Sequence, residues 1–316
     1  MKKSGIKKYF KEYKWSNIFA MIKNNSAKPK ICSDDYKGKL VVITGATSGI
    51  GYHTARKYAS MGANLLTINR NIQKSEKLCR EIEDEFGVKC DYKIADLSIL
   101  KDIHNVADEL VKIKDPIDVL IHNAGIFLTK KEINPNGIEK VFVVHYLSSF
   151  IINYRLMNKL KAQGKARIIF VGSEGHRFAA WGIHLDDINW EKHKYTGLKS
   201  YGTAKVAQLL SMFTFEEKFK DSGVTIISMH PGAVKSQTGK ENGKIYRSFR
   251  KHLLDKNLKD TNISAEALYY LGVSKEVEGI TAKFFNLTTL EEPSPPALDK
   301  KVAYELWDKS IKLAQL

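Results

Sequence analysis

The chain has 316 residues, of which 43% are hydrophobic, and carries a formal net charge of +16. This length can bury the core of one large domain or of two small ones. Residues 1–30 contain nine lysines and one acid, Glu12, and so hold a net charge of +8. The basic charge is concentrated near the N-terminus and does not indicate that the folded part binds nucleic acid.

Cysteine usage and hydropathy exclude further classes of protein. The three cysteines, Cys32, Cys79 and Cys90, are odd in number and form no C-x-x-C pair, which argues against a disulfide framework or a metal site. No apolar run approaches the roughly 18 residues that a membrane span needs, and residues 1–30 lack the apolar core of a secretory signal. We therefore expect a location in the cytoplasm, or at the periphery of a cytosol-facing membrane surface.

Residues 1–36 are predicted to be a basic tail outside the folded domain. Two sets of apolar residues form helical stripes that point to opposite sides, namely Ile6, Tyr9, Phe10 and Tyr13, and Trp15, Ile18, Phe19 and Ile22. A break near Ser16 would let both stripes be used, since serine is a favourable N-cap. A lysine-rich amphipathic segment suits contact with an anionic membrane. The alternative is a disordered basic tail, and the sequence leaves both open.

Residues 37–316 alternate short apolar runs with helical stretches. The apolar runs are 39–45, 63–70, 88–97, 117–125, 166–173, 224–232 and 281–287, and the clearest helical stretches are 72–86, 102–113 and 137–161. This alternation predicts βαβ units and a parallel sheet. We expect one α/β domain, a doubly wound Rossmann-type sheet of about seven strands with helices on both faces. Sites in such sheets lie at the carboxyl ends of the strands.

The turn after the first strand contains Gly45, Gly49 and Gly51, with Ser48 between them. Glycines at this place let the backbone approach a pyrophosphate and leave a helix N-terminus free to bind it. Because the turn follows a strand and opens a helix, it predicts a dinucleotide site. The alternative is a tight turn without a ligand.

The end of the second strand indicates which dinucleotide is bound. NAD-selective sites place an acid there to hydrogen-bond the ribose 2′-hydroxyl, whereas this chain has Asn69 followed by Arg70. A guanidinium can bind a 2′-phosphate through two parallel hydrogen bonds. We predict NADP(H) rather than NAD(H) as the cofactor; the alternative is a solvated arginine at a loop tip.

Tyr201 and Lys205 lie four residues apart in a predicted helix, so that their side chains share one face. Lysine is rarely buried without a partner. Taken alone, the pair is also consistent with a lysine that reaches water beside a tyrosine.

The glycine turn, "HNAG" at 122–125, Ser173 and Tyr201-x-x-x-Lys205 occur in an order that resembles the short-chain dehydrogenase/reductase family. The resemblance covers about residues 37–313, and the stretch 278–310 is similar to the ending of the retinol-dehydrogenase-like branch. It implies the following cofactor contacts: Thr44, Gly45, Gly49, Ile50 and Gly51 at the pyrophosphate, Asp96 and Leu97 at the adenine, Asn123, Ala124 and Gly125 beside the cofactor, and Pro231, Gly232, Val234 and Ser236 over the nicotinamide.

The resemblance also implies that Ser173, Tyr201 and Lys205 carry the chemistry. Reduction of a carbonyl needs a hydride on carbon and a proton on oxygen. A phenol has an unperturbed pKa of about 10, and a nearby ammonium favours the phenolate, so Tyr201 is expected to act as acid or base. Lys205 would lower the pKa of Tyr201 and contact the nicotinamide ribose. Ser173 would donate a hydrogen bond to the substrate oxygen.

One position departs from the family pattern. "VHYLSSF" at 144–150 places His145 where the family usually has an asparagine that helps to hold a proton-relaying water. Histidine can hydrogen-bond and titrate near neutrality. His145 could preserve the relay, change its pH dependence, weaken the enzyme, or be a core histidine with a backbone partner.

Two segments are expected to set substrate choice. The first contains Phe178, Trp181, Ile183, Leu185 and Trp190, which either line an apolar site or simply pack, and the second is the basic segment 238–260, expected to form a lid. The branch resemblance implies a lipophilic alcohol, aldehyde or ketone, such as a retinoid, a steroid or a lipid aldehyde.

We therefore predict an NADP(H)-dependent oxidoreductase with a small lipophilic substrate and no nucleic-acid partner. The assembly state, monomer or homo-oligomer, stays open. The alternative function is an NADP(H)-binding sensor or scaffold with little catalysis, because His145 replaces the usual asparagine.

Overall fold

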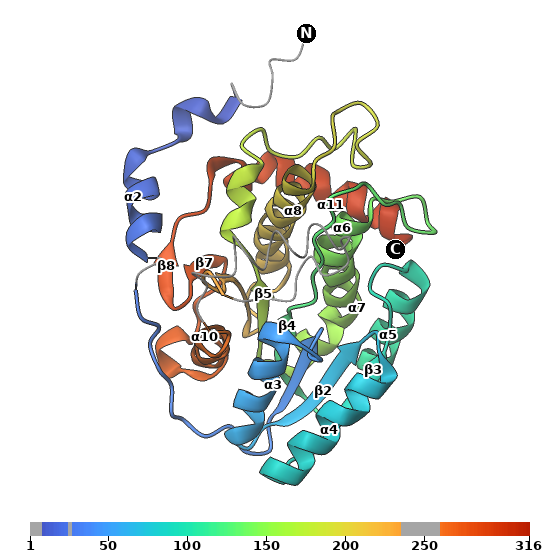
Figure 1. Cartoon of the computed structure of the whole chain (residues 1–316), viewed down its shortest axis with the longest axis vertical. Helices are drawn as coiled ribbons and strands as arrows, with labels where there is room; N and C mark the ends of the chain where they lie inside the picture. The colour runs from blue at the N-terminus through green and yellow to red at the C-terminus, as the bar shows by residue number, and fades with distance from the viewer. Residues whose placement is uncertain (1–7, 25–26, 235–259) are drawn as a thin grey trace.

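The computed structural model describes residues 8–24, 27–234 and 260–316. One sheet runs through the molecule in the strand order β3-β2-β1-β4-β5-β6-β7-β8 (Figure 1). Its strands are β1 (Leu40–Thr44), β2 (Asn64–Asn69), β3 (Cys90–Ile94), β4 (Ile117–His122), β5 (Ala166–Val171), β6 (Val224–His230), β7 (Lys283–Asn286) and β8 (Thr289–Glu291).

The first seven strands are parallel, and β8 alone pairs antiparallel, with β7. Each of the seven parallel strands lies within a predicted apolar run, so the predicted doubly wound sheet is confirmed. The eighth strand was missed because it is a three-residue strand that directly follows a short turn.

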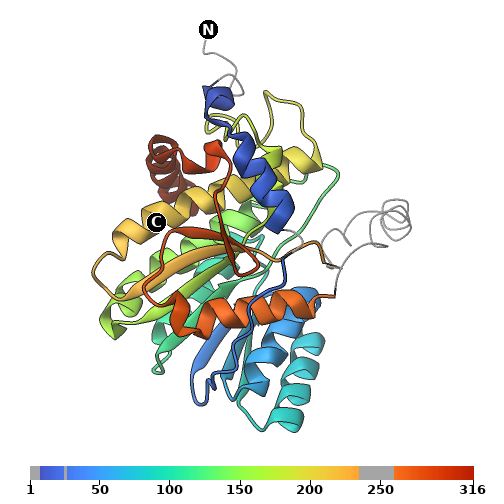
Figure 2. The same ribbon diagram turned by 90° about the vertical axis from the view of Figure 1, so that its left-hand side faces the viewer.

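Helices cover both faces of the sheet (Figure 2). The helices packed on one face are α3 (Gly49–Ser60), α4 (Ile72–Phe86) and α10 (Asn262–Val273). Those on the other face are α5 (Leu100–Lys112), α7 (Ser148–Gln163), α8 (Gly197–Lys218) and α11 (Lys300–Ala314). Short helical turns complete the description: η1 (Phe10–Glu12), α6 (Lys140–Phe142), η2 (Val143–Leu147), η3 (Glu174–Phe178), η6 (Lys275–Val277) and η7 (Pro295–Leu298).

Alternation along the strands divides the core into two layers. In β1, Val42 packs with α5, α7 and α8, whereas Val41 and Ile43 pack with α3, α4 and α10. Both sides of the strand are buried because helices cover both faces of the sheet, as the near-continuous apolar runs predict.

The helix predicted at 72–86 has the same bounds in the structure, and its ends show why. The Asn71 side chain accepts a hydrogen bond from the backbone N–H of Lys74 at the N-terminus, and Gly87 ends the helix with φ of 66°. These are a typical N-cap and a left-handed C-cap. The stretch predicted as helical at 137–161 instead begins at Lys140 and contains a π-helical turn, η2.

The described part of the N-terminal segment packs on the domain rather than extending from it. Its helix α2 (Trp15–Asn24) lies beside β8 (Figure 1). The Tyr9 hydroxyl donates a 2.9 Å hydrogen bond to Asp299, and the Asn24 amide donates one of 2.9 Å to Glu291. Tyr9 is buried, with only 3% of its surface exposed. This packing differs from the tail outside the domain that the charge pattern predicted. No helix in the described ranges is long and apolar enough to cross a bilayer.

Candidate active site

A cavity of about 650 Å³ opens at the carboxyl ends of the strands. It lies where the strand order reverses, between β1 and β4, which is the usual ligand position in a doubly wound sheet. The predicted site residues that line it are Gly45, Ser48, Gly49, Ile50, Asn69, Arg70, Asp96, Leu97, Asn123, Ala124, Gly125, His145, Ser173, Tyr201, Lys205, Pro231, Gly232 and Val234. Ser236, and the predicted lid at 238–260 apart from Asp260, lie outside the described residues.

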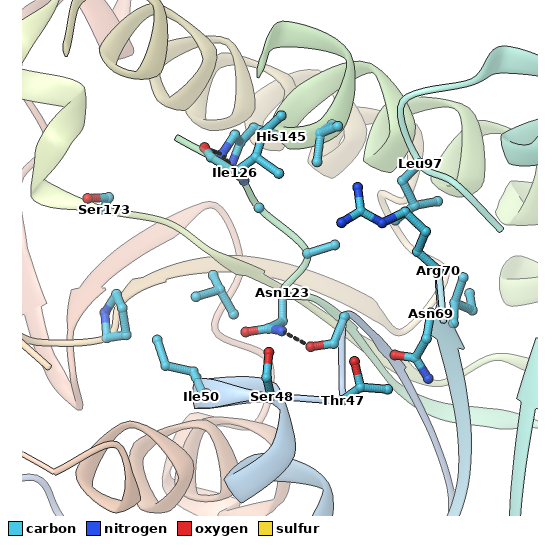
Figure 3. A pocket seen from close by; sticks show the side chains of 18 of the residues that line it. Thr47, Ser48, Ile50, Asn69, Arg70, Leu97, Asn123, Ile126, His145 and Ser173 are labelled. Atoms are coloured by element: carbon cyan, nitrogen blue, oxygen red, sulfur yellow. Dashed lines mark hydrogen bonds between the residues drawn. The ribbon is translucent and has the colours of Figure 1, made fainter. Parts of the chain in front are cut away.

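The glycine turn is packed too tightly for side chains. Gly45 has φ of +70°, and a Cβ on Gly51 would lie 2.3 Å from the Gly45 carbonyl oxygen. The Asn123 amide donates a 2.8 Å hydrogen bond to the same oxygen, which ties the end of β4 to the turn (Figure 3). Thr44 does not line the cavity; its buried hydroxyl accepts hydrogen bonds from the backbone N–H groups of Asn123 and Ala124.

The first turn of α3 opens into this cavity. Ser48 occupies the N-cap position but makes no side-chain capping hydrogen bond, and Ser48, Gly49 and Ile50 all line the cavity. The first amides of a helix have no partner within the helix and carry a partial positive charge. This donor set, with a backbone that lacks side chains at Gly45 and Gly49, fits a pyrophosphate.

Asn69 and Arg70 perform different tasks. Asn69 is buried, and its side-chain oxygen accepts a 2.8 Å hydrogen bond from the Ala46 backbone N–H, so it fixes the glycine turn. Arg70 is exposed and extends from the end of β2 toward the cavity (Figure 3). Lys74, on the first turn of α4, also lines the cavity. Neither cation forms an ion pair within the described residues, so both can bind a phosphate.

Asp96, which was predicted to lie beside the adenine, shapes the loop after β3. Its carboxylate accepts hydrogen bonds from the backbone N–H and the hydroxyl of Ser98, at 2.9 and 2.7 Å. Its own N–H donates to Asp102 at 3.0 Å. The loop therefore has a fixed conformation beside Leu97, which lines the cavity.

Ser173, Tyr201 and Lys205 meet at the opposite end of the cavity. Ser173 follows β5, and its hydroxyl accepts a 2.9 Å hydrogen bond from the Gly175 backbone N–H. A Cβ on Gly175 would lie 2.5 Å from the Tyr201 ring, so a glycine is needed there for the ring to approach Ser173. Lys205 is buried, and its ammonium donates hydrogen bonds to the Val171 carbonyl at 2.7 Å and to the Gln208 side chain at 3.2 Å.

Burial dominates the electrostatics of this trio. It raises the pKa of Tyr201, and the neighbouring Ser173 side chain partly offsets that rise. The sequence predicted that Lys205 would lower the pKa of Tyr201. In the structure the ammonium lies 5.9 Å from the Tyr201 ring centre and is bound by other acceptors. Burial also lowers the pKa of Lys205 to about 7, because a low-dielectric surrounding disfavours the charged form.

His145 lies in the π-helical turn, edge-on to the ring of Tyr201, with ring centres 5.1 Å apart. Its Nε2 contacts the backbone of Ile126, at 3.0 Å from the N–H and 2.7 Å from the carbonyl (Figure 3). Its Nδ1 has no partner among the described residues. Burial, followed by the nearby charge of Lys205, holds the pKa of His145 well below its ordinary value, so the ring is neutral.

The aromatic segment after β5 contributes little to the described wall of the cavity. None of Phe178, Trp181, Ile183, Leu185 and Trp190 lines it. Trp181, Ile183 and Leu185 pack against the core, and Phe178 is 52% exposed. Of the two alternatives that the sequence left open, packing accounts for Trp181, Ile183 and Leu185.

Several lining residues were not singled out from the sequence. The most informative are Lys74, Lys140 and His230. Lys74 could have been found because it lies in the first turn of the helix predicted at 72–86, four residues after Arg70. His230 could have been found because it ends the sixth strand, directly before Pro231 and Gly232. The sequence did not indicate that Lys140 lines the cavity, because its position depends on how α6 packs.

Comparisons with known proteins identify relatives of this chain. A family model described as short chain dehydrogenase matches residues 39–182. Mouse retinol dehydrogenase 13 is 32% identical over 284 residues, which cover 88% of this chain and 84% of that protein. Human WW domain-containing oxidoreductase is 30% identical over 292 residues, which cover 89% of this chain and 69% of that protein.

Solved structures show the same fold. An uncharacterised protein from Mycobacterium paratuberculosis superposes with a TM-score of 0.71 at 24% identity, covering 89% of this chain and 95% of its own. An NADPH-dependent 3-quinuclidinone reductase from Rhodotorula rubra has a TM-score of 0.62 at 20% identity, covering 83% and 95%. A 7α-hydroxysteroid dehydrogenase complexed with NADH has a TM-score of 0.63 at 18% identity, covering 82% and 97%.

Proposed function

The chain belongs to the short-chain dehydrogenase family, in its retinol-dehydrogenase-like branch, and we propose that it is an NADP(H)-dependent oxidoreductase that interconverts a lipophilic alcohol and its aldehyde or ketone. The observation that carries the proposal is one cavity in which Ser173, Tyr201 and Lys205 lie at one end and Arg70 at the other. The glycine turn and the open helix N-terminus lie between them.

When bound, the nicotinamide supplies or accepts the hydride. Tyr201 gives the proton to the substrate oxygen during reduction and takes it back during oxidation. Ser173 orients that oxygen and donates a hydrogen bond to the charge that develops on it. Lys205 as an ammonium stabilises the tyrosinate that remains after proton transfer, since it lies one helical turn from Tyr201.

The choice of NADP(H) rests on residues of this chain. The related structures include one described as NADPH-dependent and one with NADH, so kinship alone does not select a cofactor. Arg70 and Lys74 place two cations beside the cavity, where NAD-selective proteins of this fold place an acid. We assign the 2′-phosphate to these two side chains.

The lipophilic substrate class rests on the branch, whose relatives include proteins named retinol dehydrogenase 12 and 13. The test is oxidation of NADPH by purified protein over a panel of retinoid, steroid and alkyl aldehydes and ketones. Tyr201→Phe should lower turnover about 10²- to 10⁴-fold with NADPH affinity nearly unchanged, because only the proton donor is removed. If Tyr201→Phe retains more than about a tenth of the rate, another group is the acid.

The alternative function, an NADP(H)-binding sensor or scaffold, is favoured by the neutral His145 packed against Tyr201. The same panel separates the two functions. NADPH binding without oxidation of any member of the panel supports the sensor, and turnover that depends on Tyr201 supports the enzyme.

We further propose that the N-terminal segment contacts an anionic membrane surface. Phe10 and Phe19 are 74% and 66% exposed, and Lys11, Lys14 and Lys23 are exposed near them in the chain. Apolar burial and electrostatic attraction would act together, at about 1 kcal/mol per basic residue. Sedimentation with anionic liposomes at low and high salt tests this, and absence of binding at low salt refutes it.

A further inference from the structure

Gln208 lies on α8, three residues after Lys205, and is buried with 2% of its surface exposed. Its side chain contacts two parts of the candidate site. Oε1 accepts a 3.2 Å hydrogen bond from the Lys205 ammonium, and Nε2 donates one of 3.1 Å to the His145 carbonyl. We propose that Gln208 is a positioning residue, whose amide holds the Lys205 ammonium in place and anchors it to the π-helical turn.

The orientation of the amide follows from its two partners. The His145 carbonyl can only accept a hydrogen bond and the Lys205 ammonium can only donate, so Nε2 must face the first and Oε1 the second. A flipped amide would place N–H groups against the ammonium and oxygen against oxygen. The π-helical turn η2 therefore fixes which end of Gln208 the lysine meets.

This arrangement also restricts the directions in which the Lys205 ammonium can donate hydrogen bonds. An ammonium has three donors, and two of them are bound by the Val171 carbonyl and by Gln208. The third remains for the cavity that Lys205 lines. Without Gln208, the ammonium would have one protein acceptor and a wider choice of directions.

No carboxylate in the described part of the chain performs this task instead. Tyr201 faces Lys205 from α8, and His145 from η2 and His230 from β6 lie within its electrostatic reach. Burial lowers the pKa of His230 to about 4 and that of His145 well below its ordinary value, so both rings are neutral. Among the described residues no carboxylate pairs with Lys205. Two neutral oxygens therefore carry the stabilisation of a buried ammonium.

The inference rests on the role that the proposed function gives to Lys205, but it can be tested without substrate. Protein labelled with ¹³C at the lysine ε-carbon would be titrated by NMR, with the Lys205 signal assigned by its loss in Lys205→Met. Gln208→Met keeps the length of the side chain and removes the acceptor amide, so the Lys205 midpoint should fall by about one pH unit. Gln208→Glu adds a negative charge at the same place, so the midpoint should rise by about one unit or more.

The two Gln208 substitutions should shift the Lys205 midpoint in opposite directions. A change in packing alone would not produce shifts of opposite sign, so this result distinguishes positioning from packing. Thr214→Val is the control, because Thr214 is buried on the same helix and its hydroxyl donates only to the Ser211 carbonyl within that helix. It should leave the Lys205 midpoint unchanged. Midpoints that shift in the same direction in Gln208→Met and Gln208→Glu, or not at all, overturn the proposal. If Gln208→Met does not fold, Gln208→Asn, one methylene shorter, should lower the midpoint.

Activity provides the second readout. The basic limb of the pH profile of kcat should move down in Gln208→Met and up in Gln208→Glu, since the charged lysine is the active form. NMR shifts of the expected signs without turnover in any variant would support the contact with Lys205 and refute the proposed function.

Discussion

Replacing Arg70 with alanine should weaken NADPH binding much more than NADH binding. The guanidinium reaches toward the cavity and forms no ion pair within the described residues, so its loss leaves no partner unpaired inside the protein. A hydrogen bond to a charged group contributes roughly 1.5–3 kcal/mol, and exposure to solvent places Arg70 at the lower end of that range. At about 1.4 kcal/mol per tenfold, we expect a loss of about 10- to 30-fold for NADPH.

The expected change for NADH is less than about twofold, because its ribose has no 2′-phosphate for the guanidinium to bind. Lys74→Ala should produce a smaller loss for NADPH, since an ammonium acts as a point charge rather than a bidentate donor. Added salt should weaken NADPH binding to the native protein more than to Arg70→Ala, because screening acts on the exposed charge pair.

The assay is titration of dihydronicotinamide fluorescence with each protein and each cofactor. Lys77→Ala is the matched control. Lys77 is exposed on α4, one turn from Lys74, and its ammonium is 3.7 Å from Glu81. It should bind both cofactors like the native protein. Unchanged NADPH affinity in Arg70→Ala would refute the assignment, and an equal loss for both cofactors would show that Arg70 acts on the fold instead.

Three further predictions follow from packing and burial. Gly51→Ala should lower NADPH affinity at least about tenfold and lower the melting temperature, because overpacking of this kind costs roughly 1–3 kcal/mol and the new Cβ would lie 2.3 Å from the Gly45 carbonyl. Lys205→Met should lose both rate and cofactor affinity. It should also flatten the pH dependence of the melting temperature between about 7 and 10.5, where only the unfolded chain holds the lysine proton and stability therefore rises with pH. Deletion of residues 1–30 should lower the melting temperature, preserve turnover of a short soluble aldehyde, and weaken binding to anionic liposomes.

Each of these outcomes has a contrary result. Native cofactor affinity in Gly51→Ala would mean that the turn can open without harm to the site. If the melting temperature of Lys205→Met depends on pH as steeply as that of the native protein, Lys205 titrates at its ordinary pKa. An unchanged melting temperature after the deletion would show that the contacts of Tyr9 and Asn24 contribute no stability.

The sequence predicted the parallel sheet because local patterns determine it. The strands that are buried on both sides are continuous apolar runs. The turns at their carboxyl ends contain recognisable residues, such as the glycines that follow β1. Arg70 could be placed at the cavity for the same reason, since its position depends only on the end of β2. The short strand β8 gave no such signal, because its three residues form a strand only by pairing with β7.

The surroundings of Lys205 could not be predicted, because they depend on packing between distant elements. The helical spacing placed Lys205 beside Tyr201, and the family resemblance implied that the ammonium would lower the pKa of the phenol and contact the nicotinamide ribose. In the structure its two acceptors come from β5 and from Gln208. Gln208 is in turn oriented by a carbonyl in a π-helical turn, and a single inserted residue in a helix leaves no periodicity that a sequence pattern can reveal.

The N-terminal segment makes contacts that its charge pattern did not indicate. Nine lysines in 30 residues resemble a solvated tail when only neighbours in the sequence are considered. Yet Lys8 and Tyr9 bind Asp299, and Asn24 binds Glu291, two acids more than 260 residues away in the chain. Glu291 also pairs with Arg177 at 2.9 Å, and Arg177 pairs with Glu174, the residue after Ser173. The segment is therefore linked through three side chains to the loop that carries the candidate serine. A membrane that bound Phe10 and Phe19 would act on a part of the chain already linked to the candidate active site.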